Sequence, residues 1–199
     1  MERGDGSIRT VPMLPDMRFN MRLFIAINFD NNTKTCLYNI GQKLKELSVK
    51  GNYTLWENYH LTVVFIGETS KVNDIKQAMD SIDAPRFNLD LKGFGSFHRT
   101  GGDIFWIGVE ENKNLVKIYS QICDELVMRG INVEKREYKP HITLGREIVL
   151  KYGFDRKEFS KSINPITIQV DKISLMKSER INGKLTYTEI YSKALDFPY

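Results

Sequence analysis

The sequence repeats one short pattern, which reads HLTVVFIG at residues 60–67 and HITLGR at residues 141–146. The chain has only three histidines, and two of them stand two residues before a threonine inside an apolar, β-branched run. Such runs are typical of buried strands. One His-x-Thr triplet alone carries little information, but its recurrence 81 residues later in the same setting indicates that both copies serve one function.

Each segment pairs an imidazole with a hydroxyl. Side chains alternate along a strand, so His60 shares a face with Thr62, and His141 shares a face with Thr143. If the two strands are neighbours, these four side chains line one cleft. Imidazole titrates near pH ~6.5, so one ring can accept a proton while the other donates one. Threonine hydroxyls bind phosphate oxygens, so the pattern predicts acid–base catalysis at a phosphate by the two histidines.

Two other interpretations of the histidines remain open at this point. A histidine in a strand is usually a hydrogen-bonded structural residue, although a matched pair favours catalysis. A zinc site would need further ligands, and no cysteine or carboxylate stands at ligand spacing from either histidine. The sequence therefore predicts no metal and no cofactor.

The composition bounds the class of protein. With 199 residues, of which 41% are hydrophobic and 27% charged, the chain is expected to form one globular domain rather than a disordered one. No apolar run is long enough to span a membrane, and the first residues lack a signal-peptide core. The net charge of +4 weakly favours an anionic partner. Cys36 and Cys123 have no metal or redox spacing, which favours a reduced cytoplasmic setting.

Residues 1–20 read as an extension that is not part of the fold, because their charges cancel and prolines and glycines interrupt any periodicity. Met17 and Met21 are both plausible native starts. We therefore expect a single domain over residues 21–199.

From residue 22 onward, strand and helix patterns alternate. Apolar residues at helical spacing predict helices over residues 33–49, 72–82 and 115–126. β-favouring runs predict strands over residues 23–29, 61–66, 87–97, 104–109, 142–144, 166–176 and 185–191. Asn182-Gly183 predicts a type I′ hairpin turn between the last two runs. Both cysteines fall within predicted helices among apolar residues, so we expect them to be buried and inert.

On these residues the sequence resembles the two-histidine phosphoesterase superfamily, in particular the bacterial and archaeal RNA 2′,3′-cyclic phosphodiesterases, historically called 2′-5′ RNA ligases. The resemblance runs from about residue 21 to 195 and includes both His-x-Thr segments in order, with matching flanks. It also includes Gly95-Ser96-Phe97, residues 105–109 and a C-terminal strand pair containing Ser178, Gly183 and Tyr187. Two positions depart from the family pattern: Val64 stands where a basic residue is common, and His98 stands where proline is common.

The resemblance implies a bilobal α+β fold, in which two pseudo-symmetric lobes with antiparallel sheets surround a central cleft. The alternating elements alone would also suit a doubly wound sheet. The implied activity is metal-independent hydrolysis of RNA 2′,3′-cyclic phosphate ends to 2′-phosphates, with possible reverse 2′-5′ ligation. His141 is the implied base and His60 the implied acid.

The implied partners are RNA ends or small nucleotide cyclic phosphates, and the chain is expected to be a monomer. Other functions of the same class stay open: a phosphodiesterase acting on 2′-5′ oligonucleotides or other cyclic phosphates, or a module that binds a nucleotide without turning it over.

Two further substrate-binding residues, Arg146 and Tyr138, are implied by the resemblance. In a regular strand Arg146 would point away from His141, so reaching the cleft requires a bulge or bend at Gly145; the alternative is an arginine facing solvent. Tyr138 would either stack on a base or pack locally. His98 is a loop histidine to which the sequence assigns no role.

Overall fold

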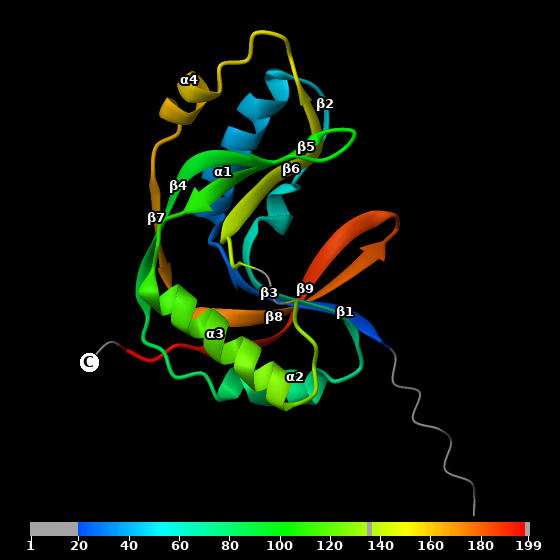
Figure 1. The fold of residues 1–199 in the computed structure, drawn as a ribbon, viewed down its shortest axis with the longest axis vertical. Coiled ribbons are helices and arrows are strands. Elements are labelled where there is room, and N and C mark those ends of the chain that lie inside the picture. The colour runs from blue at the N-terminus through cyan, green and yellow to red at the C-terminus, as the bar shows by residue number, and fades with distance from the viewer. Residues whose placement is uncertain (1–19, 135–136, 198–199) are drawn as a thin grey trace, which may run out of the picture.

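The computed structural model describes residues 20–134 and 137–197 and contains two antiparallel sheets (Figure 1). The four-stranded sheet has the order β3-β1-β8-β9, and the five-stranded sheet has the order β2-β6-β5-β4-β7. The predicted extension over residues 1–20 lies, apart from Asn20, outside the described residues. The bilobal α+β prediction is confirmed, and the doubly wound alternative is wrong because every pairing between these strands is antiparallel.

The bounds of the elements are as follows. The strands are β1 Met21–Asn28, β2 Ser48–Tyr53, β3 His60–Thr69, β4 Phe87–Phe97, β5 Asp103–Val109, β6 His141–Leu150, β7 Ile166–Val170, β8 Lys172–Ile181 and β9 Lys184–Ala194. The helices are α1 Asn31–Glu46, α2 Val72–Asp80, α3 Lys113–Met128 and α4 Arg156–Lys161, with a short 3₁₀ helix, η1, at Trp56–Asn58.

Side-chain alternation on β1 separates the core from the cleft. Leu23, Ile25 and Ile27 are buried in the main core, on one face of the strand. Phe24 and Ala26, on the opposite face, form a small second cluster with Met176 of β8, and Tyr187 of β9 packs against it. Helix α1 contacts β2 and β6, whereas α3 contacts β3 and α2 contacts β9, so each sheet has its own helical cover (Figure 1).

Local signals in the sequence explain where several elements begin and end. The Asp30 carboxylate accepts a hydrogen bond from the backbone amide of Thr33 at 2.7 Å and caps α1. Gly130 follows α3 with a φ of +67°, in the left-handed region that glycine adopts freely. Asn182 and Gly183 both have positive φ, which confirms the predicted type I′ turn between β8 and β9.

Three predictions from the sequence were wrong in detail. The single run over residues 166–176 is two strands, β7 and β8, which belong to different sheets. The predicted helix over residues 33–49 ends at Glu46, because Ser48 begins the mostly polar strand β2. Cys36 is exposed and Cys123 is only partly buried, because Cys36 falls outside the buried stripe of α1. No helix in the described part of the chain is long and apolar enough to cross a membrane.

Candidate active site

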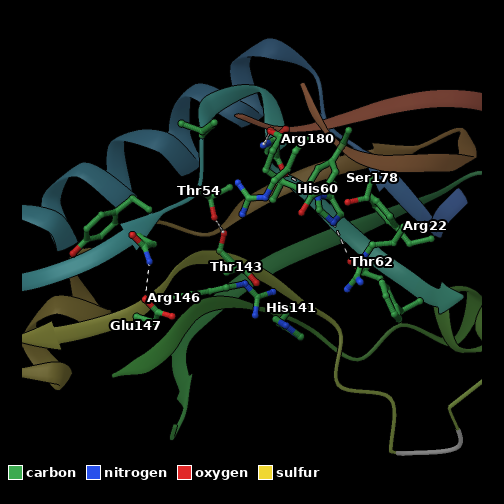
Figure 2. Close-up of a pocket in the computed structure, with 18 residues that line it drawn as sticks. Arg22, Thr54, His60, Thr62, His141, Thr143, Arg146, Glu147, Ser178 and Arg180 are labelled. Atoms are coloured by element: carbon green, nitrogen blue, oxygen red, sulfur yellow. Dashed lines mark hydrogen bonds between the residues drawn. The ribbon is translucent and has the colours of Figure 1, made fainter. Parts of the chain in front are cut away.

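The two sheets oppose each other across a cleft of about 610 Å³, which is lined by side chains from both (Figure 2). His60 and Thr62 come from β3 of the four-stranded sheet, and His141 and Thr143 come from β6 of the five-stranded sheet. All four side chains line this cleft, although the two strands belong to different sheets. The structure therefore brings the two His-x-Thr pairs to one place.

A β-bulge directly follows each threonine. In β3, Thr62 pairs with Ala26 and Val64 pairs with Ile25, so Val63 has no partner on β1. In β6, Thr143 pairs with Trp106 and Gly145 pairs with Phe105, so Leu144 has no partner on β5. An extra residue shifts the alternation of side chains by one position. The residue five positions after each histidine therefore returns to the cleft face.

These bulges settle two positions that the sequence left open. Arg146 lines the cleft, as the expected bend beside Gly145 requires, and is not on the opposite face. A Cβ atom at Gly145 would lie 2.9 Å from the Asn52 carbonyl oxygen, so glycine permits this close strand approach. Val64 is 5% exposed and belongs to the core, and Phe65 takes the cleft position beside it.

The His60 ring is held by its Nδ1 atom. Nδ1 lies 2.7 Å from the backbone oxygen of Asn58, which can only accept, so Nδ1 carries the proton in the neutral ring. Nε2 is then an acceptor, and the Thr62 hydroxyl donates to it at 3.0 Å. The rings of Phe24 and Tyr187 flank the imidazole, with centroid distances of 4.9 and 5.1 Å.

Burial lowers the pKa of His60 to about 4, because desolvation penalises the charged ring more than the hydrogen bond to the Asn58 carbonyl favours it. The positive charges of Lys34 and Arg146 act in the same direction as desolvation. His60 is therefore neutral at pH 7 in the free protein, with Nε2 accepting a hydrogen bond from the Thr62 hydroxyl.

His141 is built in the same way. Its Nδ1 donates to the backbone oxygen of Lys139, two residues earlier, at 2.7 Å, just as His60 donates to Asn58. The Phe97 ring meets the imidazole edge-on at a centroid distance of 5.0 Å. Desolvation lowers the pKa of His141, and Arg146 lowers it further, but the ring is less deeply buried than that of His60. Both histidines thus present Nε2 to the cleft.

Neighbouring backbone and side-chain groups fix the walls of the cleft. The Thr54 hydroxyl donates to the Thr143 carbonyl oxygen at 2.8 Å, and the Thr54 amide donates to the Leu144 carbonyl oxygen at 2.9 Å. Both carbonyl groups at the bulge of β6 therefore have a hydrogen-bond donor. The Asn58 amide group donates to the Leu185 carbonyl oxygen at 2.9 Å, which ties the β8–β9 hairpin to the segment that holds His60.

The cleft is rich in arginine. Arg22 and Arg180 line it together with Arg146, and within the described residues none of the three has a carboxylate at ion-pair distance. Sequence reasoning missed Arg22 and Arg180. Strand alternation would have flagged Arg22, which shares a face with Phe24, but only once the cleft face of β1 was known.

Tyr138 lies elsewhere. Its ring stacks on that of Tyr119 at 4.1 Å with an interplanar angle of 4°, and burial raises its pKa. Its hydroxyl donates to the Thr62 backbone oxygen at 3.4 Å, and it is absent from the lining of the cleft. This is the local packing that the sequence left as an alternative to base stacking. His98 lies after β4, pairs with Asp103 at 2.9 Å and is also outside the cleft lining.

The donor set does not form a metal centre. Among the residues that the structure describes, no three His, Cys, Asp or Glu side chains gather closely enough to hold an ion. Glu147 is the acidic side chain in the cleft lining, and it accepts a hydrogen bond from Asn52 at 2.8 Å. The groups that face the cleft are suited to binding an anion and transferring protons.

Two lobes that each present a bulged His-x-Thr strand to one arginine-lined cleft define a two-histidine phosphoesterase. The chain belongs to the 2′-5′ RNA ligase superfamily, whose model matches residues 38–182. This confirms the family resemblance that the two triplets carry.

The RNA 2′,3′-cyclic phosphodiesterase of Thermotoga maritima is 34% identical over 166 residues, which cover 79% of this chain and 87% of that protein. The enzyme of the same name from Methanocaldococcus jannaschii is 32% identical and covers 79% and 91%. A crystal structure of Escherichia coli LigT complexed with 3′-AMP matches with a TM-score of 0.73 at 23% identity, over 88% of this chain and 98% of that one.

Proposed function

We propose that this protein hydrolyses RNA 2′,3′-cyclic phosphate ends to 2′-phosphates, with His60 and His141 as its proton-transfer groups. The observation that carries the proposal is the convergence of two imidazoles, two threonine hydroxyls and Arg146 on one cleft. The RNA 2′,3′-cyclic phosphodiesterases to which the chain is similar support the choice of substrate.

The reaction needs two proton transfers on opposite sides of phosphorus. Water attacks phosphorus in line with the 3′ oxygen, the P–O3′ bond breaks, and a 2′-phosphate and a 3′ hydroxyl form. We assign His141 as the base that takes the proton of water, because its ring is the less deeply buried of the two. His60, protonated on Nε2 in the substrate complex, donates that proton to the departing 3′ oxygen.

Thr62, Thr143 and Arg146 bind the phosphate oxygens in this proposal. Each hydroxyl shares a strand face with its histidine, so both can donate to non-bridging oxygens while the rings act on the attacking and leaving oxygens. The Arg146 guanidinium offsets the additional negative charge of the pentavalent state. The same arrangement supports 2′-5′ ligation, in which a 5′ hydroxyl takes the place of water.

A short RNA that ends in a 2′,3′-cyclic phosphate tests the activity. We expect a 2′-phosphate product, identified by chromatography against authentic 2′-phosphate and 3′-phosphate standards, formed at the same rate with and without EDTA. Loss of activity in EDTA that zinc or manganese restores would contradict the metal-free mechanism. Formation of a 3′-phosphate would contradict the position of the broken bond. Monomeric and cytoplasmic states stay predictions from the sequence.

A substrate with sulfur in place of the 3′ leaving oxygen tests the division of roles, because a thiolate leaves without protonation. This substrate should restore activity to His60→Ala and leave His141→Ala impaired. Restoration of His141→Ala alone would reverse the two roles. Restoration of neither would contradict a separate acid and base.

A further inference from the structure

The cleft carries more positive charge than one phosphate requires. Arg146 lies three residues after Thr143 and serves the catalytic phosphate in the proposed reaction. Arg22 lines the same cleft from β1, beside the neighbouring strand β8, and Figure 2 shows it next to Ser178. Arg180 already donates to the Gly183 carbonyl oxygen at 2.9 Å, inside its own hairpin. Of the two arginines that the mechanism does not use, Arg180 is thus engaged within its own hairpin, which leaves Arg22 as the candidate for a second phosphate.

The surroundings of Arg22 form a built recess. Arg22 and Ser178 are direct cross-strand partners, so their side chains stand on the same face of the sheet. The guanidinium lies over the Phe65 ring, 5.0 Å from its centroid, and this cation–π contact orients it. Phe65 is 46% exposed although it is a large apolar side chain. A guanidinium, a hydroxyl and an open aromatic face together match a phosphate and the nucleoside attached to it.

The recess lies beside the catalytic groups and is separate from them. Ala26, the partner of Thr62, is four residues from Arg22 along β1, or about 13 Å at ~3.3 Å per residue. Phe24 stands between them, with its ring 4.9 Å from that of His60. This spacing along the strand suits the next group along a nucleotide chain.

We propose that Arg22 and Ser178 bind the phosphodiester immediately 5′ of the cyclic end, so that the enzyme acts on oligonucleotide ends in preference to mononucleotide cyclic phosphates. This inference rests on the proposed function, because it takes the cyclic phosphate to lie between the two histidines. A mononucleotide leaves the recess empty, whereas an RNA end fills it.

The test compares kcat/KM for a trinucleotide ending in a 2′,3′-cyclic phosphate with that for 2′,3′-cyclic AMP. A charge-assisted hydrogen bond is strong enough that Arg22→Gln should lower the ratio of the two values about 10-fold. Arg156→Gln is the matched control, because Arg156 also lies over a phenylalanine, Phe94, and donates to a serine, Ser96, outside the cleft lining. It removes the same charge and should leave the ratio unchanged.

A neutral substrate analogue isolates the phosphodiester from the base. Replacing that phosphodiester by a methylphosphonate should lower kcat/KM of the wild type to the value of Arg22→Gln, and it should cost the variant nothing further. For the charged trinucleotide, the salt dependence of log kcat/KM should weaken by ~0.7 in Arg22→Gln, the contribution of one phosphate contact in a single strand.

Three results would overturn the inference: an unchanged ratio in Arg22→Gln, an equal change in Arg156→Gln, or additive effects of the variant and the methylphosphonate. Fluorescence polarisation with a labelled trinucleotide ending in 2′-phosphate separates this inference from the proposed function. If the wild type hydrolyses neither substrate, the proposed function fails. In that case the inference about Arg22 is supported only if Arg22→Gln weakens binding of this RNA about 10-fold while Arg156→Gln does not. Any other result contradicts the inference.

Discussion

A bound phosphate should raise the pKa of His60 by several units. In the free protein burial holds that pKa at about 4, so only about one ring in a thousand is protonated at pH 7. A phosphodiester carries one negative charge, and at ~4 Å with an effective dielectric constant of ~20 it favours the protonated ring by about 4 kcal/mol. Since one pKa unit corresponds to ~1.36 kcal/mol, the pKa rises by about 3 units, to about 7.

This shift would turn His60 into a usable acid only when substrate is present. The measurement is an NMR titration of the His60 ring with and without 2′-AMP, assigned by the resonance missing in His60→Gln. His98, which lies outside the cleft lining, serves as the internal control, and its ring resonances should not respond to the ligand.

Kinetics give an independent check. The value of kcat/KM, which reports the free enzyme, should peak at acidic pH, whereas kcat, which reports the complex, should persist to about pH 7. The two limbs of each pH profile report pKa values of the coupled pair of rings rather than of either ring alone. A His60 pKa near 6.5 in the free protein, or one that 2′-AMP does not raise, would refute the electrostatic reasoning.

Three further predictions concern the same groups. His60→Ala and His141→Ala should each lower kcat about 10²–10⁴-fold, and the double variant should lose far less than the product, which steady-state rates would show. The folded-state pKa of His60 lies below that of the unfolded chain, so the free energy of unfolding has its full value above pH ~6.5 and falls by up to about 3 kcal/mol as the pH drops toward 4. Urea unfolding of the wild type and of His60→Gln at several pH values measures this fall. The same dependence of unfolding free energy on pH in both proteins would contradict it. Asn58→Ala removes the hydrogen bond to Leu185 and should lower the free energy of unfolding by about 1 kcal/mol. It should also lower kcat, because Asn58 positions His60. A loss of stability with no change in kcat would contradict that positioning role.

The sequence predicted which side chains share a strand face, because strand alternation is a local property. His60 and Thr62, like His141 and Thr143, share a face whatever the rest of the chain does. The sequence could not show that β3 and β6 belong to different sheets, because pairing between strands is decided by distant residues. The family resemblance supplied that step.

Sequence reasoning was incomplete where tertiary contacts decide the outcome. Tyr138 packs on Tyr119 of α3, and no local sequence pattern around residue 138 predicts this contact. The run over residues 166–176 was predicted as one strand, yet the chain leaves one sheet and enters the other at Asp171. Arg146 reaches the cleft because of a bulge in β6. Strand alternation showed that such a bulge would be required, but it could not show that the bulge exists.

The paired bulges have a consequence for how a substrate can lie. Two imidazoles related by an approximate twofold axis would accept a cyclic phosphate equally well in two opposite orientations, and only one of these places the 3′ oxygen at the acid. The fifth residue after each histidine removes this ambiguity, because it is the aromatic Phe65 in one lobe and the cationic Arg146 in the other. The duplicated scaffold therefore supplies matched chemistry, and under the proposed function this unmatched position favours one direction of the RNA strand.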